Sequence, residues 1–255
     1  MNPSHKPSPE ELGKLLTVYG RKPVLEALLD PALDCRQLHM AQTNRHGGII
    51  DEIINAAEAR RCGLREHSRE SLARISKNGK QDQGVALDIR CPDFSTVNHI
   101  LPRLNDPHCR ILALDGISNP QNVGMIIRSA VAGGVDGIIY PHKGVAALGP
   151  LVIKASAGTV FKAPLLFCDT LVQGLQQCRD MGANVAVLTS YAHQSLFEFQ
   201  PETATVYVLG GETEGVSKPV MALANAKLRI PMAGGVESLN VAVAASLISY
   251  AGALR

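Results

Sequence analysis

The sequence predicts an α/β fold, and the order of its segments supports that prediction. In both halves of the 255-residue chain, short apolar runs of strand type alternate with segments whose apolar residues recur at helical spacing. In the second half the alternation continues to the C-terminus, which implies a mostly parallel sheet with helices on both faces. Hydrophobic residues make up 45% of the chain, enough to fill a core. The length suits two modest domains or one large domain.

Four elements are expected in the first half, in the order helix, strand, helix, strand. The first helix covers 19–29, where it opens at Gly20, has Pro23 in its first turn and closes before Asp30-Pro31. The second helix covers 48–61, where isoleucines recur at helical spacing opposite charged residues. The strands cover 36–41 and 84–89. These elements predict a small α/β domain.

The middle of the chain predicts a boundary. Residues 90–109 contain Pro92, Pro102 and Pro107 among turn-forming residues, so we expect a linker that includes a short helix near 97–101. Beyond it, strands are expected at 110–114, 137–140, 164–167, 183–188, 205–209 and 227–230, and helices at 122–132, 149–157, 171–181, 219–225 and 239–254. The predicted organisation is a flexible tail at 1–17, a first domain at 18–90, a linker at 91–107 and a second domain at 108–255.

The last predicted helix is apolar around most of its circumference. Leu239, Val243, Leu247 and Tyr250 form one stripe, and alanines make up much of the remainder. A helix of this kind is expected to be covered on most sides. Because it is the last element, a second copy of the chain is the expected cover, and we predict a homodimer.

Composition and charge narrow the class of protein. No apolar run approaches the roughly 18–20 residues of a membrane span, and the polar, proline-rich start does not resemble a signal peptide. Six cysteines occur without a C-x-x-C pattern, so no metal site is predicted, and reduced thiols in a cytoplasm are expected. Residues 1–105 hold 15 Lys+Arg against 13 Asp+Glu, a net charge of +2, whereas residues 106–255 hold 10 of each. A polyanion would therefore be attracted more by the first half.

Three short segments of the second half follow predicted strands and mix glycine or proline with polar side chains. They are Asn119-Pro-Gln-Asn-Val-Gly-Met-Ile-Ile-Arg128, Leu209-Gly-Gly-Glu-Thr-Glu-Gly215 and Ile230-Pro-Met-Ala-Gly-Gly-Val-Glu-Ser-Leu-Asn-Val241. A core requires neither kind of residue, and open α/β sheets bind ligands where strands hand over to helices. The three segments together predict the parts of one site.

Most of the polar residues also have a purely structural explanation. Asn122 can cap a helix, and Ser238 is a natural N-cap of the last helix, with Asn240 in its first turn. Arg128 can be a solvated helix arginine, although Gly124 one turn earlier leaves its guanidinium uncovered on that side. For each residue alone the structural explanation is the better one, and for the set a site is favoured.

The second segment ends a hydrophobic strand in two glycines, which allows a ligand to approach the backbone closely. We assign Glu214 to the start of the following helix, whose dipole favours a carboxylate there, and keep Glu212 as a candidate site residue. The chain contains no G-x-G-x-x-G pattern, so a Rossmann dinucleotide site is not expected.

In order and spacing the three segments resemble the three motifs of the SpoU (TrmH-type) RNA ribose 2′-O-methyltransferases. The resemblance runs from about Val18 to the C-terminus, and implies the deep trefoil knot of the SPOUT class within 108–255. Tyr19-Gly-Arg-Lys-Pro-Val24 and Gln83-Gly-Val85 resemble the substrate-binding domain of this family, which is similar to a small ribosomal protein. One departure is Asn119-Pro120, where many relatives have Asp-Pro.

The resemblance implies an S-adenosylmethionine-dependent transfer to a ribose 2′-hydroxyl of structured RNA, with members that methylate a guanosine of 23S rRNA the most similar. It implies catalytic roles for Asn122, Arg128, Glu212, Ser238 and Asn240. It implies cofactor contacts from Thr189, Leu209, Gly210, Gly211, Ile230, Met232, Ser238 and Leu239. Family mechanisms make the arginine the proton acceptor, helped by an RNA phosphate. Because an arginine pKa is normally above about 12, a phosphate or alkoxide contact has at least equal weight.

Three alternatives remain open at this point. The substrate can be tRNA, or the chain can be a non-catalytic RNA-binding ribosome-assembly factor on the same fold. A third alternative is an α/β enzyme that acts on a small nucleotide and does not need the first domain. Cofactor affinity separates a catalyst from a scaffold, and deletion of residues 1–105 separates RNA from small-nucleotide substrates.

Overall fold

The computed structural model describes residues 8–251 of the chain. It divides into two compact units, Met1–Pro92 and Asp93–Arg255. Among the described residues, no helix is both long enough and apolar enough to cross a membrane.

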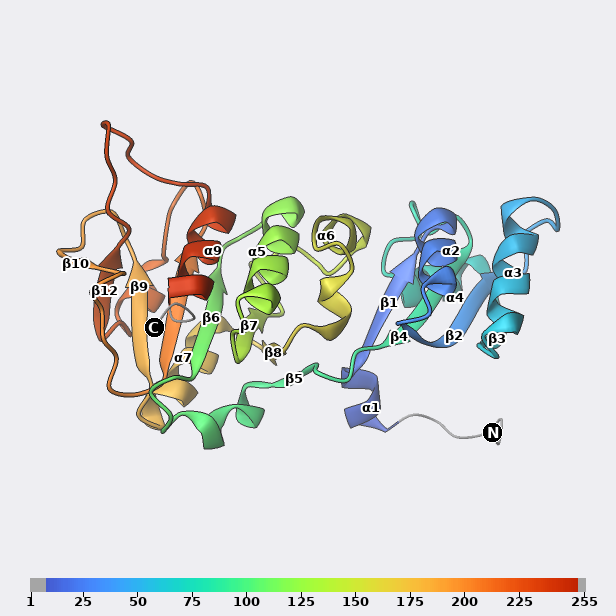
Figure 1. Ribbon diagram of the computed structural model, residues 1–255. Coiled ribbons are helices and arrows are strands. Elements are labelled where there is room, and N and C mark those ends of the chain that lie inside the picture. The colour runs from blue at the N-terminus through green and yellow to red at the C-terminus, as the bar shows by residue number, and fades with distance from the viewer. Residues whose placement is uncertain (1–7, 252–255) are drawn as a thin grey trace. The chain divides into compact units, whose positions relative to one another are not determined.

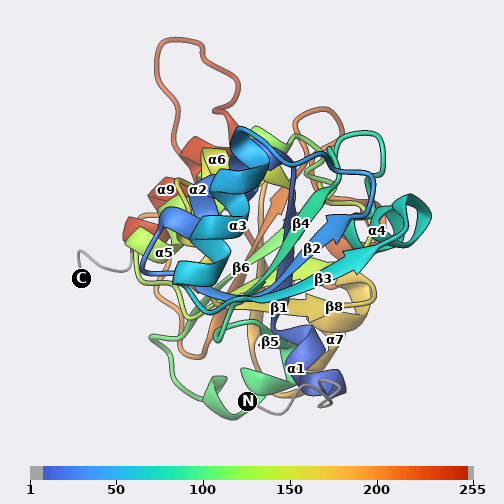
Figure 2. The ribbon, with the colours of Figure 1, turned by 90° about the vertical axis from the view of Figure 1, so that its right-hand side faces the viewer.

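The first unit is built on a mixed sheet with the strand order β1-β4-β2-β3. Its strands are β1 (Leu15–Tyr19), β2 (Asp34–Ala41), β3 (Gly63–His67) and β4 (Val85–Arg90). β4 pairs antiparallel with both β1 and β2, whereas β2 pairs parallel with β3. The helices are α1 (Pro9–Gly13), α2 (Arg21–Leu29), α3 (Ile49–Ala59) and α4 (Arg69–Ser76). Figure 2 shows α2 and α3 on one side of this sheet and α4 on the other.

The period-two alternation of the strands gives this sheet two different faces. Leu38 of β2 and Leu87 of β4 are paired across the strands and fully buried. On the opposite face, Ala41 and Ala86 pack against Leu72 of α4. The first face is thus an aliphatic core, and the second is apolar only where α4 covers it.

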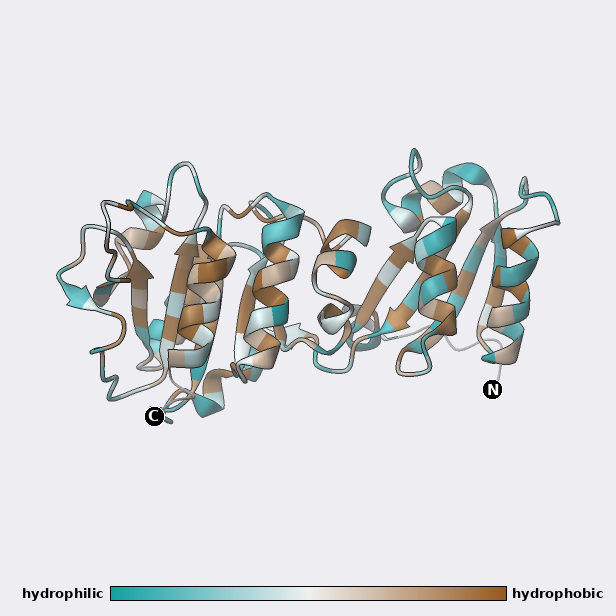
Figure 3. Ribbon diagram, turned by 45° about the horizontal axis from the view of Figure 1, so that its top comes forward, coloured by the Kyte–Doolittle hydropathy of each residue, from teal (hydrophilic) through white to brown (hydrophobic). Residues whose placement is uncertain are grey.

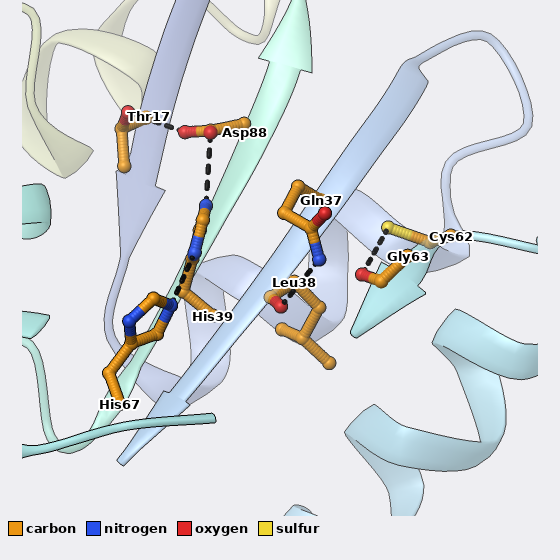
Figure 4. Close-up of polar contacts among 8 residues, drawn as sticks. All are labelled: Thr17, Gln37, Leu38, His39, Cys62, Gly63, His67 and Asp88. Carbon is orange, nitrogen blue, oxygen red and sulfur yellow. Dashed lines mark hydrogen bonds and ion pairs between the residues drawn. The ribbon is translucent and has the colours of Figure 1, made fainter. Parts of the chain in front are cut away.

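A chain of polar side chains crosses the α4 face from β1 to β3 (Figure 4). Thr17 Oγ1 donates to Asp88 Oδ1 at 2.6 Å, and Asp88 Oδ2 lies 3.0 Å from His39 Nε2. His39 Nδ1 lies 2.9 Å from His67 Nε2. Burial, and then the neighbouring His39 and Arg65, lower the pKa of His67. This network links all four strands and satisfies the buried imidazole of His39.

The second unit is built on an eight-stranded sheet in the order β10-β12-β9-β11-β6-β7-β8-β5, in which every neighbouring pair is parallel. The strands are β5 (Ser95–Thr96), β6 (Arg110–Asp115), β7 (Gly137–Pro141), β8 (Leu165–Cys168), β9 (Asn184–Leu188), β10 (Gln194–Ser195), β11 (Thr205–Gly210) and β12 (Ala226–Arg229). The helices are α5 (Pro120–Ala132), α6 (Pro150–Ala155), α7 (Leu171–Asp180), α8 (Lys218–Met221) and α9 (Val241–Ala251), with 3-10 turns η1 (Val97–His99), η2 (Leu101–Arg103) and η3 (Thr159–Lys162). Figure 1 shows α5 and α9 side by side on one face of the sheet.

The central strands of this sheet are apolar along most of their length (Figure 3). In β11 every residue from Thr205 to Leu209 is buried, as is expected of a strand with helices on both faces. The core on the α7 side contains Val185 and Val206 of the sheet together with Leu175 of α7. The predicted α/β class and the parallel sheet flanked by helices are confirmed. The trefoil knot stays a prediction.

The connection between the units differs from the expected linker. Residues from Asp93 onward belong to the second unit, and β5 pairs with β8 at the edge of its sheet. Phe94, Val97, Ile100 and Leu104 are buried. The prolines of this stretch had suggested a free connector, but the apolar residues between them have a core to fill. The sequence predicted one short helix near 97–101, and the chain forms the two 3-10 turns η1 and η2 there.

Several short elements were not predicted. α1 lies within the expected flexible tail at 1–17 and β1 begins in it, and residues 1–7 of that tail are outside the described residues. β3 (Gly63–His67) is an edge strand with no buried residue, so it lacks the apolar pattern by which strands are recognised. α4 is mostly polar, and β10 has only two residues, Gln194 and Ser195.

Candidate functional site

Four neighbouring strands of the second sheet, β6, β11, β9 and β12, end at the same edge because they pair in parallel. Gly210 at the end of β11 is paired with Asp115 at the end of β6. Thr189 directly follows β9, where its N–H donates to Leu228 O of β12 at 2.9 Å. Ile230 directly follows β12. The structure thus brings the strand ends from which all three sequence segments start to one edge of the sheet.

Three side chains, one from each segment, are joined by hydrogen bonds. Asn122 Nδ2 in the first turn of α5 donates to Glu212 Oε1 at 2.7 Å. Asn240 Nδ2 donates to the same oxygen at 3.0 Å and to Asn122 Oδ1 at 3.1 Å. Asn122 is only 6% exposed, so the surrounding protein fixes the position of its amide. Glu212 lies 90 positions after Asn122 and 28 positions before Asn240, so the three segments form one polar cluster across long stretches of sequence.

The last helix is capped by Asn240, and the prediction that Ser238 is its N-cap was wrong. α9 begins at Val241, and Asn240 Oδ1 accepts a hydrogen bond from Ala242 N at 2.9 Å. Asn240 O accepts from Ala244 N at 3.0 Å. The side-chain oxygen of Asn240 thus caps the N-terminus of α9, while its side-chain nitrogen donates to Glu212 and Asn122. Ser238 is exposed and, having no capping role, is left as a candidate site residue.

Arg128 lies on the exposed side of α5, two turns after Asn122. It forms no ion pair among residues 8–251, so its guanidinium is available to a ligand. Gly124 does not serve to uncover it, contrary to the prediction. A Cβ at Gly124 would lie 2.5 Å from Ala155 Cβ and 2.7 Å from Val152 O, so this glycine is required by the contact between α5 and α6.

The glycines of the second segment allow one backbone to approach another. A Cβ at Gly210 would lie 2.1 Å from Gly215 C, and one at Gly211 would lie 2.7 Å from Gly116 O. Gly215 N also donates to Gly211 O at 2.9 Å. The sequence analysis explained these two glycines by close approach of a ligand to the backbone. In the structure, both are instead required by close contact with other backbone atoms of the protein. The tight loop that results holds Glu212 opposite Asn122.

The carboxylate that serves the following helix is Asp115, and not Glu214. α8 begins at Lys218 without an acidic residue in its first turn, so Glu214 lies too early in the chain to act on it. Instead, Asp115 Oδ2 accepts a hydrogen bond from Ser217 N at 2.7 Å. This bond joins the end of β6 to the residue that precedes α8, two positions after the second segment. No role was predicted for Asp115, although its position at the end of the strand before the first segment was a signal.

Helices α5 and α9, which carry the first and third segments, are also joined along their length. Ser246 Oγ donates to Ser129 Oγ at 2.7 Å. At their C-terminal ends, Arg110 donates to Ser249 O and, at 3.2 Å each, to Gly133 O and Gly134 O. These contacts fix the relative position of the two helices, and sequence reasoning assigned no role to any of these residues.

The eight candidate cofactor residues differ in exposure. Leu209 is buried inside β11, Thr189, Gly210, Gly211 and Ile230 are partly exposed, and Met232, Ser238 and Leu239 are exposed. Among residues 8–251, the one backbone hydrogen bond donated from 231–239 to another backbone group runs from Val236 N to Ala233 O. Figure 1 shows this segment extending away from the sheet between β12 and α9. Its backbone groups are therefore free to bind an adenosine-type ligand, which fits the predicted cofactor.

Comparison with known protein families gives two matches. The model of the SpoU rRNA Methylase family matches residues 110–250. A second model, described as RNA 2′-O ribose methyltransferase substrate binding, matches residues 17–94. Proteins from Mycolicibacterium vanbaalenii and Mycobacterium ulcerans, each described as an uncharacterized tRNA/rRNA methyltransferase, are 30% identical over 233 residues, or 91% of this chain and 74% of each relative.

Solved structures are similar over nearly the whole chain. AviRb from Streptomyces viridochromogenes, a SpoU methyltransferase solved in complex with AdoMet, is 23% identical with a TM-score of 0.61, covering 94% of this chain and 90% of AviRb. A protein of the TrmH family from Porphyromonas gingivalis is 27% identical with a TM-score of 0.59, covering 94% and 89%. An AdoMet-bound rRNA methyltransferase from Sinorhizobium meliloti is 22% identical with a TM-score of 0.61, covering 95% and 88%.

The parallel sheet, the clustered segments at its edge and the two family matches define an enzyme of the RNA ribose 2′-O-methyltransferase class. The chain belongs to the SpoU rRNA methylase family.

Proposed function

We propose that this enzyme transfers the methyl group of S-adenosylmethionine to the ribose 2′-hydroxyl of a guanosine in 23S rRNA. The observation that supports the proposal is the hydrogen-bonded cluster of Asn122, Glu212 and Asn240, because it unites the three segments from which the candidate cofactor residues come. S-adenosylmethionine supplies an electrophilic methyl group on a sulfonium centre. The protein must then align the ribose hydroxyl and allow its proton to leave.

Alignment is the task for which the cluster is best suited. Asn122 and Asn240 are neutral amides whose hydrogen bonds to each other and to Glu212 fix their orientation before RNA arrives. Polar groups whose orientation is fixed in advance lower the cost of reaching the reactive geometry. Ser238 lies in the exposed stretch of the third segment, two residues before Asn240, and can complete the contacts to the sugar.

Arg128 is assigned a contact to an RNA phosphate or to the oxyanion that develops on the ribose. It is exposed and forms no ion pair among the described residues. A guanidinium gives charge-assisted hydrogen bonds to such oxygens and holds its own proton firmly. The phosphate bound beside it can take the proton from the hydroxyl.

We also propose that the active form is a homodimer that buries the outward side of α9. Ala242, Ala245 and Ile248 of this helix are buried within the chain, whereas Val243 and Tyr250 are each 44% exposed. Met125 on the adjacent α5 is 47% exposed. The apolar stripe predicted from the sequence is thus the side of α9 that a second copy would cover. The expected oligomer is measured by light scattering, and a monomer at micromolar concentration would contradict it.

The decisive experiment compares Arg128→Ala with wild type. We expect loss of methyl transfer to ribosomal RNA with little change in the Kd for S-adenosylmethionine by isothermal titration. Wild-type turnover in the variant would refute the assigned role. Mapping of 2′-O-methylation across total RNA, with and without the gene, identifies the substrate, and a lost mark in tRNA alone would refute the 23S rRNA assignment.

A further inference from the structure

Exposed aromatic side chains are concentrated around β10 of the second unit. Among residues 8–251, three tyrosine or phenylalanine side chains are exposed, namely Tyr191, Phe197 and Tyr250. Tyr250 lies on α9, whereas Tyr191 and Phe197 flank the short strand β10. Tyr191 is 90% exposed, and Phe197 is 47% exposed. The ring of Tyr191 therefore contributes almost nothing to the core of its own chain.

Tyr191 lies in the loop 189–193, between β9 and β10, at the edge of the sheet where the candidate site lies. It follows Thr189, a candidate cofactor residue, by two positions. Thr189 N donates to Leu228 O at 2.9 Å, and β10 pairs in parallel with Leu228 and Arg229 of β12. Figure 1 shows β10 beside β12 at the end of this sheet. Both ends of the loop are thus joined to the strand from which the third segment starts.

The loop has an ordered backbone although the ring is exposed. Ala192 N donates to Thr189 O at 3.3 Å, which closes a turn around Tyr191. Ala192 and Leu196 are buried, so the residues on the C-terminal side of the ring are anchored in the unit. Within residues 8–251, the hydroxyl of Tyr191 forms no hydrogen bond and its ring contacts no other aromatic ring. An aromatic ring on a fixed backbone loses little conformational entropy when a ligand covers it.

Cations accompany the aromatic ring at this edge. Lys227 and Arg229 are exposed and alternate along β12 with the buried Leu228, so both lie on one face of the strand. Neither forms an ion pair among the residues that the structure describes. The stretch 189–200 contains one carboxylate, Glu198. Aromatic rings beside cations are the features by which proteins hold single-stranded nucleic acid.

The exposure of the ring favours RNA over the cofactor as its ligand. A small ligand is bound in a concave site that covers most of its surface, and a ring that is 90% exposed does not line such a concavity. The ring is accessible instead to a large ligand that arrives from solvent. A ribose hydroxyl can be aligned for methyl transfer only when its nucleotide is held in one orientation, and the base is the flat surface by which a ring can hold it.

We propose that Tyr191 stacks on an unpaired base of the RNA at the methylated position, and so helps to hold the target nucleotide in the site. This inference rests on the proposed function, because it assigns a substrate-binding residue to that same site. Every base has a face on which an aromatic ring can stack, so Tyr191 selects unpaired over paired RNA and does not select one base. Lys227 and Arg229 attract the adjoining phosphates.

The first test measures methyl transfer to deproteinised 23S rRNA by full-length variants. Tyr191→Ala removes the ring, and Tyr191→Phe keeps the ring without its hydroxyl. The control Met181→Ala also removes an exposed apolar side chain, but at the opposite edge of the sheet, because Met181 precedes β9 and Tyr191 follows it. Thermal unfolding of all three variants should match wild type, since neither side chain is buried.

We expect Tyr191→Ala to lower kcat/KM for the RNA about 10-fold, the effect of losing one base stack, with an unchanged Kd for S-adenosylmethionine. Tyr191→Phe and Met181→Ala should keep the kcat/KM of wild type. Wild-type kcat/KM in Tyr191→Ala would overturn the inference. A weaker Kd for S-adenosylmethionine would overturn it by placing the ring on the cofactor, and a changed oligomer in light scattering would overturn it by placing the ring in a protein interface.

The second test detects stacking without methyl transfer. The chain contains no tryptophan, so Tyr191→Trp introduces a single indole ring that keeps the stacking surface. A base that stacks on indole quenches its fluorescence. We expect 23S rRNA to quench the fluorescence of Tyr191→Trp, a fully paired RNA duplex to leave it unchanged, and Met181→Trp to respond to neither RNA. Absence of quenching by 23S rRNA, or equal quenching by the duplex, would contradict stacking on an unpaired base.

The two tests separate this inference from the proposed function. If wild type transfers methyl groups to RNA and the fluorescence of Tyr191→Trp is not quenched, the inference fails and the function stands. If 23S rRNA quenches Tyr191→Trp alone and wild type transfers no methyl group, the ring stacks on RNA and the proposed function fails.

Discussion

Asn240 serves the last helix and the candidate site with different atoms of one side chain, so two substitutions can separate these roles. Its Oδ1 caps α9 through Ala242 N, and its Nδ2 binds Glu212 and Asn122. Asn240→Ser keeps an oxygen that can cap the helix but removes the amide donor. Asn240→Ala removes both.

The magnitudes follow from these contacts. Loss of an N-cap costs about 1 kcal/mol, and loss of the hydrogen bonds to the cluster costs roughly 0.5–1.5 kcal/mol each, toward the low end because Asn240 is exposed. A change of 1 kcal/mol shifts Tm by about 2–4 °C in a unit of this size. We therefore expect Asn240→Ala to melt about 4 °C below wild type and Asn240→Ser about 2 °C below it. Methyl transfer should fall about 10²-fold in both variants, because each releases the orientation of Asn122 and Glu212.

The assays are calorimetric unfolding and the rate of tritiated methyl transfer to ribosomal RNA at saturating S-adenosylmethionine. Equal Tm values for the two variants would show that Asn240 does not cap the helix in solution. A serine variant with wild-type turnover would show that the hydrogen-bonded cluster is not needed for alignment, which would refute the reasoning from geometry.

Three further predictions test the packing and the titrating groups. Gly124→Ala should lower the free energy of unfolding by about 1–3 kcal/mol, because the added Cβ would meet the backbone of α6. The control Gly13→Ala has open space around the added Cβ and should leave the urea midpoint unchanged. Equal urea midpoints for the two variants would contradict the close contact. Arg110→Gln should lower the free energy of unfolding by roughly 2 kcal/mol, because the carbonyls at the ends of α5 and α9 lose their hydrogen bonds. An unchanged urea midpoint would show that these hydrogen bonds do not stabilise the fold. Burial raises the pKa of Cys109 to about 11 and that of Cys178 to about 12 from an ordinary 9.0, so stability should be full below pH 9 and fall as the pH rises toward 12. The double variant with alanine at both positions should show a smaller loss between pH 8 and pH 10 in urea titrations, and an equal loss would contradict this origin.

The second unit could be predicted from sequence more fully than the first, and for a physical reason. Strands such as β6 and β11 are covered on both faces, so they are continuous apolar runs between turn residues. The longer helices α5 and α7 show a clear helical period. β3 and α4 lie at the edge and on the partly covered face of the first sheet, where polar residues suffice. The buried Phe94 and Leu104 were misassigned to a linker because proline was given more weight than the apolar residues around it.

The candidate site could be recognised as a set of segments but not as a set of contacts. Local sequence places polar residues after strands, which predicted that the segments share a site, and the resemblance to the SpoU family then selected Asn122, Glu212 and Asn240. It could not show that Asn240 is the cap, that Gly124 is required by α6, or that Gly210 is required by another turn of backbone. Each of these depends on an atom brought close by the sheet from a distant part of the chain.

By itself, the sequence determined the fold class, the family and the three segments, because periodicity and motif spacing are local properties that the chain carries in any conformation. Tertiary structure alone decided which atoms meet: the shared oxygen of Glu212, the bond from Ser217 to Asp115, and the hydrogen bonds from Arg110 to the ends of α5 and α9. The physical reason is that hydrogen bonds and packing act over a few ångströms, and only the parallel register of the strands brings residues that are 90 or more positions apart within that range.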